Sequence, residues 1–165
     1  MYIRTERLTI RPLCEGDDAA LSVMLRDGQI KKTYMLPDFE DEQQCMKLVR
    51  RLRELSADDS RFVAGICRGE ELIGFLNDVE TRDGSVEMGY FVDPAHWNRG
   101  YATEALKAVI AHLQKTGFRQ VRTGAFEENI ASIRVMEKAG MTRLEETEII
   151  EYRGKRHTCV LFAVG

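Results

Sequence analysis

The middle of the chain changes from a strand-like pattern to a helical one and back again. Ser85–Val92 follows the turn Arg82-Asp83-Gly84 and is strand-like, and Thr103–Lys115 spaces its apolar side chains three and four residues apart. Gln120–Phe126 then returns to a short strand-like run. Because a helical crossover of this kind joins parallel strands, the segment requires a parallel pair within a sheet, with a helix packed on one face.

Hairpin patterns on both sides of this segment add antiparallel strands. Before it, two strand-like runs are joined by Arg68-Gly69-Glu70, and after it two more are joined by Arg153-Gly154-Lys155. An alternating run near the N-terminus ends at Pro12, which cannot donate to a strand ladder. These strands are expected at Arg7–Arg11, Arg61–Cys67, Leu72–Glu80, Arg143–Tyr152 and His157–Val164.

Amphipathic segments outside the crossover predict further helices. Asp17 is placed to cap the first helix, which Gly28 is expected to end. The second helix runs from about Asp41 to Leu55, and the last spans Ile130–Ala139. The sequence thus predicts an α/β (α+β) fold, a mixed sheet of six to seven strands with helices on both faces.

Length, charge and hydropathy bound the class of protein. The 165 residues fit one domain, and no linker or low-complexity tract divides them. A formal net charge of −3 gives no overall basic excess of the kind that duplex-binding modules show. No apolar run approaches the roughly 18 residues of a membrane span, and the N-terminus lacks the apolar core of a signal peptide. We therefore expect a single cytoplasmic domain over residues 1–165, with neither a nucleic acid nor a membrane as partner.

The cysteines and histidines show no metal-ligand spacing. No C-x-x-C pair occurs, and these side chains are scattered along the chain. We expect reduced thiols, as is usual in the cytosol, and no metal site. The residues concerned are Cys14, Cys45, Cys67, Cys159, His96, His112 and His157.

The segment Val92–Ala102 lies between a predicted strand and the start of a predicted helix. Free backbone N–H groups and the positive end of the helix dipole make such a junction an anion site. Gly100 allows a tight turn, Ala102 leaves room for a ligand, and Arg99 adds a positive charge. We predict a phosphate or pyrophosphate held by the amides from about Asn98 to Ala102. The Rossmann fingerprint and the P-loop motif are absent, which excludes those two kinds of nucleotide site.

Three stretches carry a resemblance to a known family. They are Glu87-Met-Gly-Tyr-Phe-Val-Asp-Pro, Trp97-Asn-Arg-Gly-Tyr-Ala-Thr-Glu-Ala-Leu and Glu128-Asn-Ile-Ala-Ser-Ile-Arg-Val-Met-Glu-Lys-Ala-Gly-Met. In family order and spacing, they strongly resemble the GCN5-related N-acetyltransferases, most closely the branch of the ribosomal-protein N-terminal (alanine/serine) acetyltransferases. The opening Thr5-Glu-Arg-Leu-Thr-Ile-Arg-Pro-Leu is similar to that branch's first strand, so the resemblance covers nearly the whole chain.

The resemblance implies acetyl-CoA as cosubstrate. In the family, the loop that corresponds to Trp97–Ala102 wraps the CoA pyrophosphate, and the two parallel strands splay apart so that pantetheine lies between them. Many relatives begin this loop with Gln or Arg where Trp97 stands here, but backbone amides carry the contact, so we expect binding to survive. Cofactor contacts are expected from Phe91, Val92, Trp97, Asn98, Arg99, Gly100, Tyr101, Ala102 and Asn129.

Acetyl transfer to an amine also needs a base, because the amine is protonated at neutral pH. Glu87 lies on the strand where relatives often carry a catalytic glutamate, and it is our candidate; the alternative is an exposed carboxylate or a partner for an arginine. The resemblance places Ser132 near the sulfur, where its hydroxyl could donate to the departing thiolate. Asn129 is a favoured N-cap of the last helix and, by resemblance, a pantetheine contact.

The acceptor is expected opposite the CoA, near the loop Asp27–Phe39 and the turn Tyr152–Lys155. That loop would supply an apolar wall, and an acidic run within and after it could attract a cation. The apolar residues are Tyr34, Met35, Leu36 and Phe39, and the acidic ones are Asp38, Glu40, Asp41 and Glu42.

These features predict an acetyl-CoA-dependent N-acetyltransferase that transfers the acetyl group directly to a primary amine in a ternary complex. The acceptor is a protein N-terminal α-amine or a small-molecule amine, since substrate choice resides in variable loops. The alternative is a non-catalytic CoA-binding sensor or interaction module, which would keep Trp97–Ala102 without needing Glu87 or Ser132. Two copies of the chain could associate as a homodimer.

Overall fold

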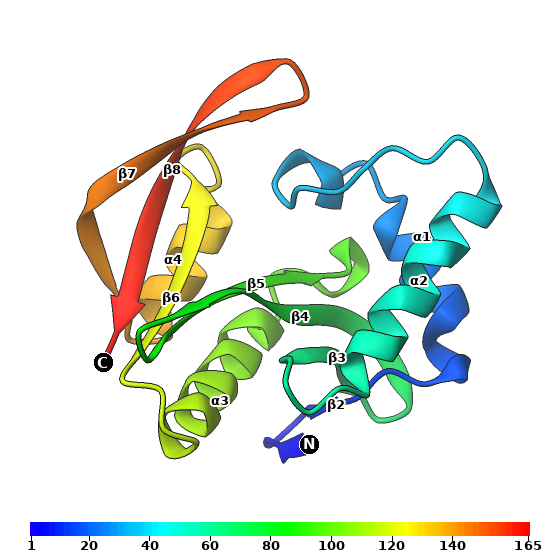
Figure 1. Ribbon diagram of the computed structural model, residues 1–165, viewed down its shortest axis with the longest axis horizontal. Coiled ribbons are helices and arrows are strands. Elements are labelled where there is room, and N and C mark those ends of the chain that lie inside the picture. The colour runs from blue at the N-terminus through cyan, green and yellow to red at the C-terminus, as the bar shows by residue number, and fades with distance from the viewer.

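The computed structural model describes residues 1–165 and places eight strands in one sheet. The strands are β1 (Ile3–Arg4), β2 (Thr9–Arg11), β3 (Val63–Arg68), β4 (Glu71–Arg82), β5 (Ser85–Val92), β6 (Gln120–Phe126), β7 (Thr142–Tyr152) and β8 (Lys155–Val164). Their order across the sheet is β1-β2-β3-β4-β5-β6-β8-β7 (Figure 1). The predicted mixed α/β architecture is confirmed, with one strand more than the expected six or seven. The additional strand is the two-residue β1, which is too short to show an alternating pattern.

β5 and β6 are the parallel neighbours that the crossover requires, and they pair only near their first residues. Ser85–Glu87 pairs with Gln120–Arg122, and all other neighbouring strands are antiparallel. Directly after this pairing, the Thr123 hydroxyl on β6 donates to the Met88 carbonyl on β5 at 2.8 Å. The two strands then diverge toward their carboxyl ends, as the resemblance implies (Figure 1).

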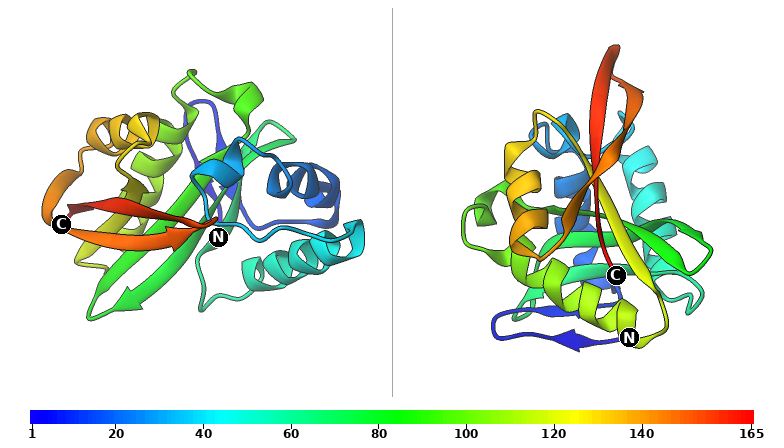
Figure 2. Two further views of the ribbon diagram at one scale, coloured as in Figure 1. Left: turned by 90° about the horizontal axis from the view of Figure 1, so that it is seen from above. Right: turned by 90° about the vertical axis from the view of Figure 1, so that its left-hand side faces the viewer.

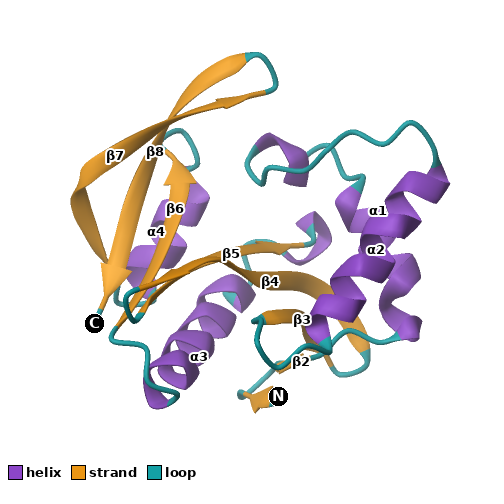
Figure 3. Ribbon diagram, in the orientation of Figure 1, coloured by secondary structure: helices purple, strands orange, loops and turns teal.

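Four helices cover the sheet, two on each face. They are α1 (Asp18–Leu25), α2 (Glu42–Ser56), α3 (Tyr101–Lys115) and α4 (Ile130–Lys138). α1 and α2 lie on one face, and α3 and α4 lie on the other (Figure 2, Figure 3). Alternate residues of β5 face the two layers: Met88 packs with α3 in one core cluster, and Phe91 packs with α1 and α2 in another. None of the helices is both long and apolar enough to cross a membrane.

The ends of α1 differ from the sequence expectation. The Asp17 carboxylate does not cap this helix. It accepts hydrogen bonds from the Arg11 guanidinium at 2.7 and 2.9 Å and from the Cys14 amide at 2.8 Å. The helix ends at Leu25, so Gly28 is not its stop signal. The ion pair with Arg11 therefore replaces the capping bond that the sequence predicts, because a buried carboxylate is stabilised more by an opposite charge.

Candidate active site

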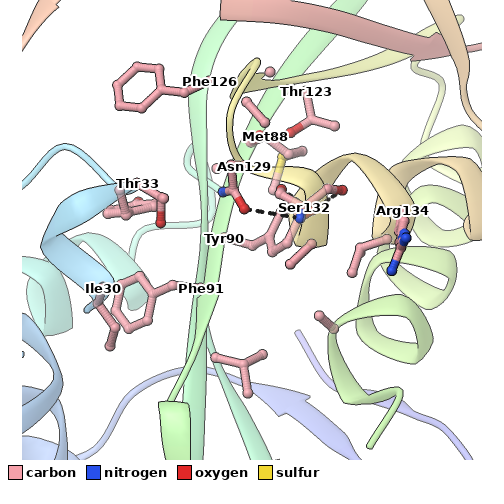
Figure 4. Close-up of a pocket in the computed structure, with 18 of the residues that line it drawn as sticks. Ile30, Thr33, Met88, Tyr90, Phe91, Thr123, Phe126, Asn129, Ser132 and Arg134 are labelled. Carbon is pink, nitrogen blue, oxygen red and sulfur yellow. Dashed lines mark hydrogen bonds between the residues drawn. The ribbon is translucent and has the colours of Figure 1, made fainter. Parts of the chain in front are cut away.

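A cavity of about 1060 Å³ opens where β5 and β6 diverge. It is lined from both faces of the sheet, by the starts of α3 and α4, by the two parallel strands and by the loop between α1 and α2 (Figure 4). Arg99 is the only candidate site residue from the sequence that does not line it. The candidates that do are Glu87, Phe91, Val92, Trp97, Asn98, Gly100, Tyr101, Ala102, Asn129 and Ser132.

The loop before α3 forms a cradle of backbone amides on one side of the cavity. Gly100 has a left-handed φ of 79°, and α3 begins directly after it at Tyr101 rather than at Thr103. The first N–H groups of a helix have no partner within it, so the turn that begins at Tyr101 offers donors to an anion. On the other side of the loop, the Trp97 indole donates to the Val92 carbonyl at 2.6 Å and holds the loop against the end of β5.

The N-terminal segment braces this cradle, which the sequence patterns did not indicate. Glu104 accepts hydrogen bonds from the Thr5 hydroxyl at 2.6 Å and from the Arg7 amide and guanidinium at 2.9 and 2.7 Å. The same guanidinium donates to the Arg99 carbonyl at 2.9 Å and lies 4.7 Å from the centre of the Tyr101 ring. Arg99 thus takes part in the loop through its backbone carbonyl. Arg7, which lies between β1 and β2, holds the loop in place by its hydrogen bond to that carbonyl.

Glu87 projects from β5 into the cavity on the face that carries α1 and α2. Burial raises the pKa of Glu87 above the usual carboxyl range, the Glu148 carboxylate raises it further, and Arg122 opposes both effects. Arg122 lies opposite Glu87 in the strand register but forms its salt bridge with Glu146, so Glu87 has no direct ion pair with an arginine. A half-buried carboxylate with a raised pKa that lines a cavity has the properties of a general base.

Asn129 and Ser132 lie together at the start of α4. The Asn129 side chain accepts a hydrogen bond from the Ser132 amide at 3.2 Å, which confirms its expected role as the N-cap. The Ser132 hydroxyl lies 2.8 Å from the Tyr90 hydroxyl. Tyr90 and Phe91 point to opposite faces of β5, so that Tyr90 meets α4 while Phe91 lies beside Ile30 (Figure 4).

The side of the cavity opposite the amide cradle is lined by Tyr34, Asn77 and Gly89. The Tyr34 hydroxyl donates to Asn77 Oδ1, and its ring packs edge-on against Phe91 with the ring centres 4.9 Å apart. A Cβ atom at Gly89 would lie 3.1 Å from Asn77 Oδ1 and 3.3 Å from the Tyr34 hydroxyl. Gly89, which is two residues from Glu87 on β5, therefore leaves room for Tyr34 to lie directly over this strand. Only the register of β4 against β5 brings Asn77 opposite Gly89, and the sequence offered no sign of it.

The turn between β7 and β8 meets the loop between α1 and α2, as the expected acceptor site requires. The Tyr152 hydroxyl donates to the Lys31 carbonyl at 2.6 Å. The Arg153 guanidinium forms two hydrogen bonds with Asp38, at 2.7 and 3.1 Å. Asp38 also pairs with the Lys31 ammonium at 3.2 Å, so its charge is compensated within the protein.

Only part of the expected apolar wall lines the cavity. Tyr34 and Met35 line it, whereas Leu36 is buried with α1 and α2 and Phe39 packs beneath the Lys31 ammonium. Successive residues of an irregular loop point in different directions, so the whole run cannot face one cavity. Of the acidic residues that follow, Asp41 caps α2 by accepting from the Gln44 amide at 2.8 Å.

A family model described as the acetyltransferase (GNAT) domain matches residues 7–142 of the chain. The chain belongs to the GNAT acetyltransferases. It is therefore an acyltransferase, and the resemblance of its sequence to the GCN5-related N-acetyltransferase family is confirmed. Among curated relatives of this GNAT enzyme, the uncharacterized N-acetyltransferase YoaA of Bacillus subtilis is 25% identical over 146 residues, which cover 86% of this chain and 82% of the relative.

Two solved structures share the fold of this GNAT enzyme over nearly its whole length. A GNAT-family acetyltransferase from Bacillus anthracis gives a TM-score of 0.85 at 24% identity, with 99% of this chain and 98% of that one covered. RimL, described as a ribosomal L7/L12 alpha-N-protein acetyltransferase in complex with coenzyme A, gives a TM-score of 0.86 at 19% identity, with 99% and 97% covered. At these identities the likeness shows the fold.

Proposed function

We propose that this GNAT enzyme, as one domain over residues 1–165, is an acetyl-CoA-dependent N-acetyltransferase that transfers the acetyl group directly to a primary amine in a ternary complex. One observation carries the proposal: a single cavity joins the amide cradle at Trp97–Ala102 to the half-buried carboxylate of Glu87. An anion site and a base thus lie on the two sides of one opening in the sheet, which suits a reaction between two substrates.

Acetyl-CoA fits the chemistry of the cradle side. Its pyrophosphate suits the free amides at the start of α3, and the diverging backbones of β5 and β6 offer unpaired groups to the amides of pantetheine. Asn129 lies at the opening on the α4 side, and Phe91 and Val92 end the strand that borders it. RimL shares the fold and is described in complex with coenzyme A, which supports this assignment.

Glu87 is proposed as the general base. The acceptor enters as an ammonium ion, the Glu87 carboxylate takes one of its protons, and the freed lone pair attacks the carbonyl carbon of the thioester. A C–N bond forms, the C–S bond breaks, and its electron pair goes to sulfur, where the Ser132 hydroxyl donates a hydrogen bond. The nitrogen releases its second proton to solvent water as the amide forms. The raised pKa favours this role because a stronger base removes the proton more readily at neutral pH.

Two classes of acceptor are proposed, a protein N-terminal α-amine and a small-molecule amine. RimL is described as an alpha-N-protein acetyltransferase, and its likeness in fold favours the first class. The second class is retained because the acceptor side is built from the loop between α1 and α2 and from the β7–β8 hairpin, and substrate choice varies with such segments within one fold.

Steady-state release of CoA thiol from acetyl-CoA, with peptides and small amines as two arms of a panel, tests the proposal. We expect turnover with at least one amine, loss of most of it in Glu87→Gln, and a smaller loss in Ser132→Ala. Glu145→Gln is the matched control, because Glu145 is exposed on β7 and does not line the cavity. Tight CoA binding by calorimetry without turnover of any amine would contradict the proposal and favour a non-catalytic sensor.

A further inference from the structure

The Tyr90 hydroxyl meets the Ser132 hydroxyl inside the cavity. The two oxygens are 2.8 Å apart, and the next acceptor within reach of Tyr90 is the Ser132 carbonyl, at 3.5 Å. Tyr90 comes from β5 and Ser132 from the first turn of α4, so the contact spans the two elements that border the cradle side. Both residues line the cavity and are partly buried (Figure 4).

Each hydroxyl carries one hydrogen, so the direction of this bond decides what Ser132 can do. If Ser132 donated to Tyr90, it would have no hydrogen left for a second acceptor. A phenol is a stronger donor than an aliphatic alcohol, which favours donation from Tyr90 to Ser132 Oγ. Burial raises the pKa of Tyr90 to about 12, so its hydroxyl keeps its hydrogen throughout the physiological range. The Ser132 hydrogen is then free to point into the cavity.

We propose that Tyr90 is a positioning residue for acetyl transfer, which holds the Ser132 hydroxyl so that its hydrogen is directed at the sulfur of the departing CoA. The inference rests on the proposed function. As the C–S bond breaks, its electron pair goes to sulfur, and the Ser132 O–H stabilises that charge by a hydrogen bond without being transferred. The thiolate takes its proton from water as CoA leaves, and Tyr90 keeps its own proton throughout.

Tyr90 also packs against the core on the α3 side, and this structural role must be separated from positioning. Tyr90→Phe keeps the ring and removes only the hydroxyl. We expect kcat to fall about tenfold, the effect of one hydrogen bond, while KM for acetyl-CoA and for the amine stay within twofold. Ser132→Thr keeps a hydroxyl at the same position and is expected to retain both activity and sensitivity to Tyr90→Phe.

A double-mutant cycle gives the decisive readout. In the Ser132→Ala background, Tyr90→Phe is expected to have no further effect on kcat, because the hydroxyl that it orients is gone. If Tyr90→Phe lowers kcat tenfold both with Ser132 present and in the Ser132→Ala variant, Tyr90 does not position Ser132 and its role is packing. A change in KM for acetyl-CoA alone would lead to the same conclusion. If Tyr90→Phe fails to fold, equal kcat in Ser132→Thr and Ser132→Ala would overturn the proposal, whereas higher kcat in Ser132→Thr would support it. Absence of turnover in the unsubstituted enzyme would overturn the proposed function as well, which distinguishes the two failures.

Discussion

The two sides of the cavity are built in different ways. The cradle side comes from one continuous segment that ends β5 and begins α3, together with the first turn of α4, and it offers mainly backbone amides. The acceptor side is assembled from the loop between α1 and α2, from β4 and β5, and from the β7–β8 hairpin, and it offers side chains such as Glu87, Tyr34 and Glu148.

This difference is expected to separate the binding of CoA, on the cradle side, from selectivity for the acceptor amine, on the other side. Backbone amides can bind an anion whatever side chains surround them, so the cradle side is expected to tolerate changes such as Trp97 at the start of its loop. The acceptor side depends on side chains that are held by long-range contacts, so single substitutions there are expected to alter the acceptor or the chemistry. The following predictions test whether the two sides are separable.

The largest effect is expected from Glu87→Gln. Removal of the base should lower kcat by about 100-fold or more, while CoA binding measured by calorimetry remains within about twofold. Because the folded-state pKa of Glu87 is raised, ionisation costs stability as the pH rises above the unfolded pKa of about 4.3. The melting temperature of the variant at pH 8 should therefore be no lower than that of the unsubstituted enzyme. A large fall in CoA affinity would show that the sides are not separable.

Gly100→Ala should affect the cradle side alone. The φ of 79° is strained for alanine by ~1–2 kcal/mol, and the new Cβ would lie 3.3 Å from the Arg7 guanidinium. We expect KM for acetyl-CoA to rise about tenfold and KM for the amine to stay nearly constant. Gly69→Ala is the matched control, since Gly69 has a φ of 62° and open space around it. Equal effects of the two substitutions on KM would argue against a cradle at Gly100.

Gly89→Ala should affect the acceptor side alone. The new Cβ would press on Asn77 Oδ1 and the Tyr34 hydroxyl, at 3.1 and 3.3 Å, and displace Tyr34 from its place over β5. A rise of roughly threefold to tenfold is expected in KM for the amine, with KM for acetyl-CoA unchanged, because the contact costs on the order of 1 kcal/mol. Gly28→Ala, which has open space around its Cβ, is the control. An unchanged KM for the amine would place the acceptor elsewhere.

The smallest effect is a shift in the pH profile. Glu148→Gln removes a carboxylate that raises the pKa of Glu87, so that pKa should fall. The base then stays ionised to lower pH, and the acid limb of kcat/KM for the amine should move to lower pH. Profiles of the two enzymes measured with the same amine check this. A shift to higher pH would mean that Glu148 stabilises ionised Glu87 instead.

Most of the cradle side could be predicted from the sequence because its main determinants are local; the exception is the contact of Glu104 with Thr5 and Arg7, which has no local sign. The sequence predicts the strands Ser85–Val92 and Gln120–Phe126 with the observed bounds, and the stretch from Trp97 to Ala102 matches a family pattern in one continuous run. Thr103 as the start of α3 was two residues late, since propensity does not show that Gly100 adopts a left-handed φ.

The acceptor side could be predicted only in outline. The sequence predicts an acceptor near the loop Asp27–Phe39 and the turn Tyr152–Lys155, and the structure brings these two segments together. Neither the hydrogen bond from Tyr152 to Lys31 nor the pairing of Arg153 with Asp38 has a local sign. Asn77 likewise reaches the cavity through strand register alone. Such contacts depend on how distant segments pack, and no periodicity within either segment encodes them.

The contact between Tyr152 and Lys31 joins residues that are 121 positions apart in the chain. Contacts that close so long a loop form late in folding, because the chain must lose much entropy before they are made. The strand–helix–strand unit needs only neighbouring segments and can assemble first. During refolding, we therefore expect affinity for CoA to return before discrimination among amines, because the amine-facing side is completed only when the final hairpin reaches the loop at Lys31.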